Sequence, residues 1–445
     1  MLNFIIIFLF AIGTLIYLRN TKWALLYCVL VQILSLPLFS LMANCPFQHS
    51  LGDVANIVSK FSMYYFLVFS VIMLCRSNIS SKCHKLLFAF AIFSFYVLLS
   101  KVLITGTFAT VPTVIMEVAF PVILFLAIFS SPNCVIHDSK LKVLTRNIII
   151  LELVVSGINA FGIYLFIPHY FPTVVEGQWG NYYTLNESKI AGTFDRYNSL
   201  AGFLATVYMF VLHLYFVRRW IVRRRFYIIT IAFLIVVLMT GAKISLVSML
   251  LFLGAYSFKY KKKTRMPIMA LGLCFSFILT LLASYTPGTI SNDGIDRQFT
   301  GFANAINGDK GEDNSTLSLS SYLLENYLDK APFTGNNNLW KGKDAYGNFT
   351  NHSLELFNAD AKLALILVDS GILGFSLTIL CFWFIFKIMR TSLPQKDRWG
   401  IFMLFCYYFI QTITDGGFFD VFLFPLSYIF FNYLRCSQTS IQVKK

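Results

Sequence analysis

The sequence contains little charge for its length. Only 13% of its 445 residues are Asp, Glu, Lys or Arg, whereas 57% are hydrophobic. So few charged side chains cannot cover the surface of a water-soluble protein of this size. The composition therefore excludes a soluble globular protein and predicts a polytopic membrane protein.

Several sequence patterns that carry chemistry are also missing. No Gly-rich phosphate loop ending in Lys-Ser/Thr occurs, and no GxGxxG pattern opens a helix after a strand. The nine Cys are spread over apolar runs and connections, so they predict no disulfide framework, and Cys83-His84 has no second ligand pair nearby for a metal. We expect no cofactor and no metal. We find no paired broken helices repeated in two halves, which many transporters have.

The sequence is instead rich in apolar runs of membrane-spanning length. They predict an all-α fold of about 12–13 transmembrane helices. The runs lie at residues 2–18, 23–43, 58–75, 86–104, 112–130, 148–168, 199–217, 226–240, 243–258, 266–285, 362–386, 399–415 and 418–434. The first run has no basic leader and no small-residue cleavage site, so we interpret it as a retained helix.

The runs and the polar intervals between them divide the chain into six parts. N-terminal transmembrane helices occupy residues 1–168, an outward loop 169–198, central helices 199–285, a large outward loop with short helices 286–361, C-terminal helices 362–434 and a cytoplasmic tail 435–445. A loop as long as 286–361 is uncommon unless it acts as a lid or binding element. We therefore predict that the working surface lies there.

Most Lys and Arg residues fall in every second connection. The densest clusters are at 218–225 and 259–265. By the positive-inside rule these clusters face the cytoplasm, and the two long loops face outward. The net charge of +15 is then mostly membrane anchoring, and we expect no nucleic-acid partner.

A few ionisable residues fall inside or at the ends of the predicted spans. Lys243 follows a tight outward turn, and Lys362 and Asp369 lie about two helical turns apart in the run after the large loop. Charged groups at membrane depth are costly and are therefore functional candidates, although an interfacial anchor is the alternative for Lys243. Glu152, near the inner end of the sixth run, we interpret as structural.

The end of the first outward loop is dense in charge. Residues 187–198 include Lys189, Asp195, Arg196 and Asn198. Because Lys and Arg bind phosphate through charge-assisted hydrogen bonds, this segment could hold an anionic lipid head group. A solvated cap at the membrane surface is the alternative.

Four short motifs resemble those of a known superfamily. They are Lys-Ile-Ala-Gly-Thr-Phe at 189–194 followed by Asn198, Thr-Gly-Ala-Lys at 240–243, Pro-Phe-Thr-Gly at 332–335, and Asp-Ala-Lys at 360–362 followed by Asp-Ser-Gly-Ile-Leu-Gly at 369–374. Their order and outward placement resemble the O-antigen ligase and repeat-unit polymerase superfamily, which includes the Wzy-type polymerases of O-antigen and capsule assembly. Lys189 and Lys243 stand where Arg is common in that family, and Lys lacks the two-pronged geometry of Arg.

The resemblance implies a metal-independent, GT-C-like glycosyltransferase of the bacterial inner membrane. It would transfer an undecaprenyl-pyrophosphate-linked glycan at the periplasmic or exterior face. Pyrophosphate would be bound by cations, which stabilise the charge that develops on the leaving group. A general base would assist the attacking sugar hydroxyl, and a third group of residues would support the site. The candidates are Lys189, Arg196, Lys243 and Arg297 for pyrophosphate, Asp195, His352 and Asp360 for the base, and Asn198, Glu355, Lys362 and Asp369 for support.

The sequence leaves several functions open. A repeat-unit polymerase would use a second lipid-linked unit as acceptor, whereas an O-antigen ligase would use lipopolysaccharide core. A lipid-linked oligosaccharide flippase or other transporter, and a membrane receptor or scaffold, are alternatives from other classes. For the polymerase, the expected partners are the lipid-linked oligosaccharide, membrane lipid and a chain-length regulator protein.

Overall fold

The computed structural model describes part of the chain. The described residues are 2–19, 23, 27, 30–31, 33–34, 65, 67–105, 113–130, 138–161, 190, 192–194, 197–240, 242–260, 272, 284–286, 288–289, 328, 332–335, 362–414, 426–431 and 433–435. Within these ranges the regular structure is helical and there is no strand, which confirms the predicted all-α class for this part of the chain.

The helices follow the apolar runs. The α-helices are α1 (Leu2–Arg19), α5 (His84–Thr105), α6 (Thr113–Ser130), α7 (Asp138–Ala160), α9 (Tyr197–His213), α10 (Arg223–Met239), α11 (Lys243–Tyr260), α16 (Lys362–Thr391) and α17 (Arg398–Thr414). A 3-10 turn, η1 (Ser81–Cys83), precedes α5, and a π-helical segment, η3 (Leu214–Arg218), continues α9. Two helices differ from prediction: α7 begins before the expected run, and α16 is interrupted at Gly371.

Some of the helices are long and apolar enough to cross a membrane. In the described part of the chain this holds for Ser81–Ser100, Ser199–Arg218 and Ile366–Thr391, and shorter apolar helices accompany them. Large apolar side chains also lie on the surface, including Phe88 (70% exposed) and Phe258 (72% exposed). Such surfaces suit lipid rather than water. These features indicate a membrane protein; the total of 12–13 spans stays a prediction, because several of the runs lie outside the described residues.

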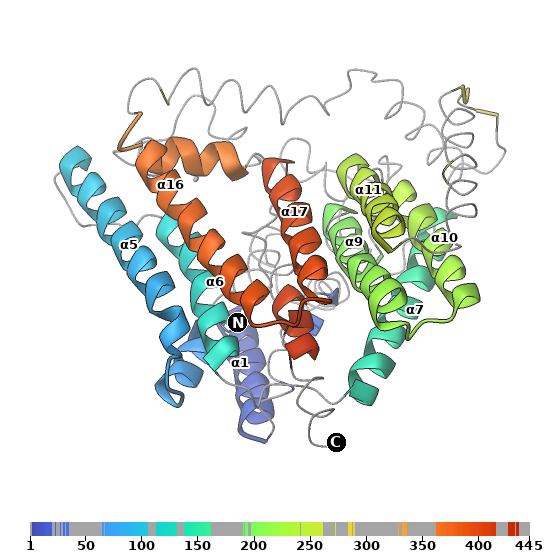
Figure 1. Ribbon diagram of the computed structural model, residues 1–445, viewed down its shortest axis with the longest axis horizontal. Helices are drawn as coiled ribbons and strands as arrows, with labels where there is room; N and C mark the ends of the chain where they lie inside the picture. The colour runs from blue at the N-terminus through green and yellow to red at the C-terminus, as the bar shows by residue number, and fades with distance from the viewer. Residues whose placement is uncertain are drawn as a thin grey trace. The chain divides into compact units, whose positions relative to one another are not determined.

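The chain forms two compact units, each built from separated stretches. Unit 1 comprises Met1–Ser62 and Ile136–Gly311, and unit 2 comprises Met63–Val135 and Glu312–Lys445. Unit 1 therefore contains α1, α7, α9, η3, α10 and α11, whereas unit 2 contains η1, α5, α6, α16 and α17 (Figure 1).

In unit 1, α9 packs against both α10 and α11. Aromatic rings join the three helices at one end: Tyr215 stacks on Phe226 with ring centroids 3.9 Å apart, and Phe216 contacts Tyr260. The end of α9 and η3, the start of α10 and the end of α11 therefore lie together. We call this the basic end of unit 1, because it carries Arg218, Arg219, Arg223, Arg224, Arg225 and Lys259.

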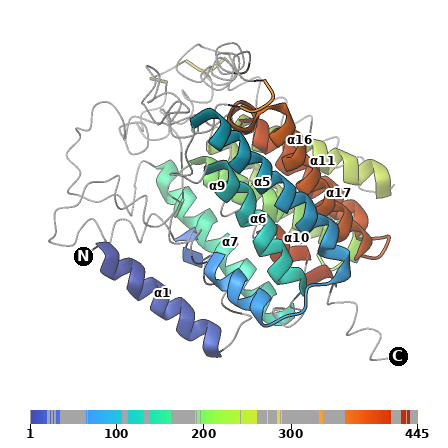
Figure 2. The same cartoon turned by 90° about the vertical axis from the view of Figure 1, so that its left-hand side faces the viewer.

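In unit 2, α16 packs against α5, α6 and α17, and α5 runs beside it in both views (Figures 1 and 2). At the end of α6, the Arg435 guanidinium donates a hydrogen bond of 2.9 Å to the Phe129 carbonyl, a favourable place for a cation because helix C-termini expose carbonyl groups. The start of α5 lies beside the end of α16, since Lys85 and Phe384 line one groove. The basic end of unit 2 carries Lys82, Lys85, Lys387, Arg390, Arg398 and Arg435.

Candidate functional site

In unit 1 the Gly-Thr-Phe motif lies at the helix ends opposite the basic end. The Ile190 backbone N–H donates to the Met239 carbonyl at the end of α10, with an N···O distance of 3.3 Å. Tyr197 then begins α9, and Lys243 begins α11 four residues after Met239. The segment that follows Lys189 is therefore bonded to the hairpin that precedes Lys243.

A carboxyl group from α7 holds the motif in place. The Thr193 backbone N–H donates to Glu152 Oε2 at 3.1 Å, and the Thr193 hydroxyl is hydrogen-bonded to Glu152 Oε1. The same hydroxyl lies 2.6 Å from the Ile33 carbonyl. Glu152 and Thr193 are both buried, so these bonds are shielded from water and fix the loop to α7.

The proton count at this contact favours a protonated Glu152. A Thr hydroxyl has one hydrogen, yet Thr193 faces two acceptors, Glu152 Oε1 and the Ile33 carbonyl. If Glu152 carries a proton, Oε1–H donates to Thr193, and Thr193 donates to Ile33. Every group is then satisfied without a buried negative charge, which would be costly at this depth.

Gly192 is required beside this carboxyl. Its φ is +62°, in the left-handed region that favours glycine. A β-carbon at this position would lie 2.5 Å from Glu152 Oε2 and 3.2 Å from Ser156 Oγ. The close approach of the backbone to Glu152 therefore depends on the missing side chain.

The described residues of this loop are buried, whereas the charged residues for which the sequence left a solvated cap open lie outside the described residues. Ile190, Thr193 and Phe194 are at most 1% exposed, and the Phe194 ring contacts Phe203 of α9. Sequence reasoning interpreted Glu152 as structural and placed it near the inner end of its run. The structure instead places it at the Gly-Thr-Phe loop, opposite the basic end, because α7 begins at Asp138 and not at residue 148. Its specific task is to bind the Gly-Thr-Phe backbone.

In unit 2 a second motif lies at a break in α16. Gly371 has φ +66° and ψ 179°, so the helix is interrupted there, and α16 changes direction near its upper end in Figure 1. A helix interruption removes the intrahelical acceptor of the following N–H group. That group, the Ile372 N–H, donates instead to the Pro332 carbonyl at 2.8 Å. The Pro-Phe-Thr-Gly turn thus completes the hydrogen bonding of the broken helix.

Tyr96 from α5 joins the same contact. Its hydroxyl donates to the Phe333 carbonyl and lies 3.3 Å from the Ser370 carbonyl. The Tyr96 ring also packs at Gly374, where a β-carbon would lie 3.0 Å from Tyr96 Cε1. One side chain from α5 therefore binds the turn and the break together.

Two glycines allow the turn and the helix to meet. A β-carbon at Gly335 (φ +70°) would lie 2.5 Å from the Gly371 nitrogen and closer still to the Asp369 carbonyl. A β-carbon at Gly371 would lie 2.8 Å from the Gly335 nitrogen and closer still to the Phe333 carbonyl. Because all these neighbours are backbone atoms, no side-chain movement could relieve the overlap.

Asp369 is the predicted site residue whose side chain the structure describes. It is 2% exposed and directly precedes Ser370 at the break. A carboxyl group at this depth is expensive, which is typical of functional positions. Its backbone carbonyl contacts Gly335, so its position is tied to the Pro-Phe-Thr-Gly turn.

For the other predicted site residues, the structure describes the backbone alone or nothing. Asn198, Lys243 and Lys362 lie in the first turns of α9, α11 and α16, and nothing is described of their side chains. The remaining candidates lie outside the described residues: Lys189, Asp195, Arg196, Arg297, His352, Glu355 and Asp360. Among the residues that are described, no group of three His, Cys, Asp or Glu side chains could hold a metal ion.

Comparison with known proteins assigns this chain to no family. No model of a protein family matches this chain, and no curated protein matches it. Sequence reasoning missed Tyr96 as a contributor. The available signal was a Tyr hydroxyl in the middle of a mostly apolar helix, because such a hydroxyl requires a hydrogen-bond partner where water is scarce.

Proposed function

We propose that the protein is a bacterial polysaccharide repeat-unit polymerase. It would transfer an undecaprenyl-pyrophosphate-linked glycan onto a second lipid-linked repeat unit at the outer face of the inner membrane. O-antigen or capsule would be the product, and the enzyme would require neither a nucleotide sugar nor a metal.

One observation carries the proposal. In each unit, taken separately, the motif segments meet at the helix ends opposite the basic end. The Gly-Thr-Phe loop lies at the end of α10 in unit 1, and the Pro-Phe-Thr-Gly turn lies on the break in α16 in unit 2. If the basic ends face the cytoplasm, both motifs face outward, where a lipid-linked glycan is found after export.

The packing also supports the proposal that the cations are attached to a rigid part of the protein. Lys189 and Arg196 flank the buried segment that Glu152 binds, and Lys243 begins the neighbouring helix. Preorganised cations stabilise a developing charge better than mobile ones, because they need not reorganise during the reaction. Arg297 would complete this group.

The proposed reaction is a substitution at the anomeric carbon of the donor sugar. The acceptor hydroxyl attacks that carbon, its proton passes to a general base, and the bond from the carbon to the pyrophosphate oxygen breaks. Asp195, His352 and Asp360 are the candidate bases. The lipid pyrophosphate leaves with the bonding electron pair, and Lys189, Arg196, Lys243 and Arg297 stabilise its charge.

Purified full-length protein supplied only with lipid-linked repeat unit provides the test. We expect a ladder of products, and we expect Lys189→Ala and Arg297→Ala each to abolish it while the protein stays folded in the membrane. Lys259→Ala is the matched control, because Lys259 is an exposed cation at the basic end of unit 1 and should leave the ladder unchanged.

The same assay separates the alternatives. Strict dependence on lipopolysaccharide core would identify a ligase. Export of the lipid-linked unit without any new glycosidic bond would identify a transporter. A normal ladder in both the Lys189 and the Arg297 variant would refute the site assignment.

A further inference from the structure

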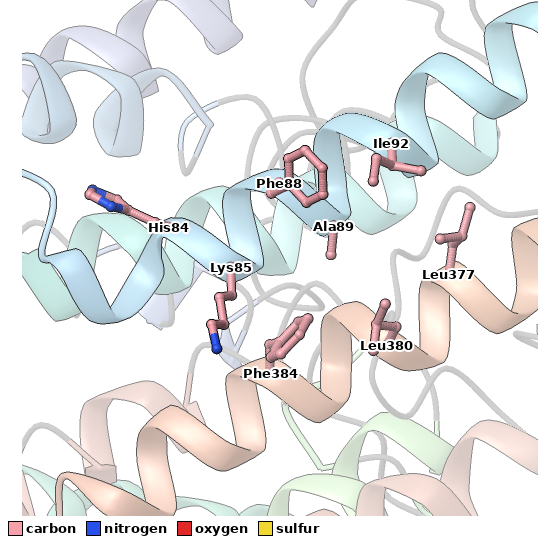
Figure 3. A pocket seen from close by; sticks show the side chains of 8 residues that line it. All are labelled: His84, Lys85, Phe88, Ala89, Ile92, Leu377, Leu380 and Phe384. Atoms are coloured by element: carbon pink, nitrogen blue, oxygen red, sulfur yellow. The ribbon is translucent and has the colours of Figure 1, made fainter.

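Unit 2 contains a groove that the proposed reaction does not use. It lies between α5 and α16, has a volume of about 470 Å³, and is open to the surroundings. Phe88, Ala89 and Ile92 line it from α5, and Leu377, Leu380 and Phe384 line it from α16 (Figure 3). Phe88 is 70% exposed and Ile92 is 40% exposed, so the apolar lining is accessible from outside the protein.

One end of the groove is cationic. His84 and Lys85 line it there, and the Lys85 side chain extends from α5 toward Phe384 of α16 (Figure 3). Among the described residues, Lys85 forms no ion pair, and Lys82 and Lys387 lie exposed near the same end. A concave apolar surface that ends in an exposed ammonium group matches an acyl chain with a phosphate head group.

In the described parts of α5 and α16, no acidic residue lies beside these cations. The sequence contains no Asp or Glu between residues 76 and 105 or between residues 370 and 391. Asp369 lies at the opposite end of α16, and Asp397, which follows α16, is buried. The cationic end is therefore complementary to an anion, and basic pockets between helices on the cytoplasmic side of membrane proteins bind anionic lipid head groups.

We infer that this groove binds an anionic phospholipid of the cytoplasmic leaflet. The acyl chain lies along Phe88, Ile92 and Leu380, and Lys85 contacts the phosphate. A polyprenol pyrophosphate that carries an exported glycan is the less suitable occupant, because the cationic end of the groove belongs to the basic end of unit 2, which the positive-inside rule assigns to the cytoplasm. This inference does not depend on the proposed function.

The test is native mass spectrometry of the full-length protein in mild detergent. Phosphatidylglycerol and phosphatidylcholine with identical acyl chains are offered together. We expect preferential retention of phosphatidylglycerol, and Lys85→Gln should reduce that preference about fivefold, since one surface Lys contributes about 1 kcal/mol to binding an anionic lipid. Lys259→Gln is the matched control, because it removes an exposed helix-end cation outside the groove and should leave the preference unchanged.

A second variant tests the apolar part of the groove. Leu380→Trp places a larger side chain at a 39% exposed lining position and should reduce retention of phosphatidylglycerol while Lys85 is intact. The thermal unfolding midpoint of each variant shows that it is folded. Equal retention of the two phospholipids, or an unchanged preference in Lys85→Gln, would overturn the inference. Undecaprenyl phosphate is then offered as a third lipid, and a Lys85-dependent preference for it over phosphatidylglycerol would also overturn the inference.

Discussion

The contact between Gly335 and the break in α16 yields a sharp prediction for Gly335→Ala. Alanine at this position must either leave the left-handed region or displace the backbone of Asp369 and Gly371. The expected result is undocking of the Pro-Phe-Thr-Gly turn from α16. Gly288→Ala is the matched control, because Gly288 has φ +82° but a β-carbon added there would have no neighbouring atom of the described residues within 4 Å.

The two variants should differ in free energy. Both incur the strain of a left-handed alanine, about 1–2 kcal/mol. Gly335→Ala additionally separates the Ile372 N–H from the Pro332 carbonyl, which costs about 1–3 kcal/mol where water does not replace the lost acceptor. The docked state should therefore lose about 2–5 kcal/mol in Gly335→Ala, the sum of the two costs, whereas Gly288→Ala should not change docking.

Hydrogen exchange of the Ile372 amide measures this difference. Since 1.4 kcal/mol corresponds to a factor of ten, a loss of about 2 kcal/mol or more should accelerate exchange in Gly335→Ala by at least about thirtyfold. Gly288→Ala should leave it at the wild-type rate. Equal acceleration in the two variants would show that close packing at Gly335 does not hold the turn, and the reasoning would be wrong.

Four further variants at three positions test the remaining contacts. Glu152→Ala should lower the free energy of unfolding by about 2–4 kcal/mol, because the Thr193 N–H loses its acceptor and a cavity remains. Glu152→Gln should lower it by less than about 1 kcal/mol, because an amide can both accept from the N–H and donate to the hydroxyl. Thermal unfolding followed by Trp fluorescence measures both, and a Gln variant as unstable as the Ala variant would argue for an ionised carboxylate. Tyr96→Phe removes the hydrogen bond to Phe333 but keeps the ring, so Ile372 should exchange about fivefold faster, for a bond worth about 1 kcal/mol; an unchanged rate would contradict that role. Gly192→Ala should lower the unfolding midpoint and abolish chain extension, since its β-carbon would lie 2.5 Å from Glu152; wild-type values for both would show that the loop tolerates a side chain.

Much of the fold could be predicted because hydropathy is a local property. A run of apolar residues long enough to cross a membrane forms a helix whatever its neighbours in the sequence, because backbone groups in lipid must form their hydrogen bonds within the segment. The expected run at 243–258 accordingly corresponds to α11, and that at 399–415 to α17. The break at Gly371 had no such signal, because a Gly within a helical pattern is often tolerated.

The candidate site could be predicted only as a set of segments. Short motifs indicated the Gly-Thr-Phe loop, the Pro-Phe-Thr-Gly turn and the segment at Asp369, but a motif does not specify what it contacts. The roles of Glu152 and Tyr96 depend on partners 41 and 237 residues away in the sequence.

The sequence by itself determined that the chain is helical and suited to a membrane, because composition and apolar run length decide both. The tertiary structure decided that Thr193 is bound to Glu152 and that Pro332 completes the hydrogen bonding of α16. The first contact requires Gly192 beside the Glu152 carboxyl, and the second requires Gly335 and Gly371 where two backbones meet. Only packing in three dimensions brings such distant segments to one place.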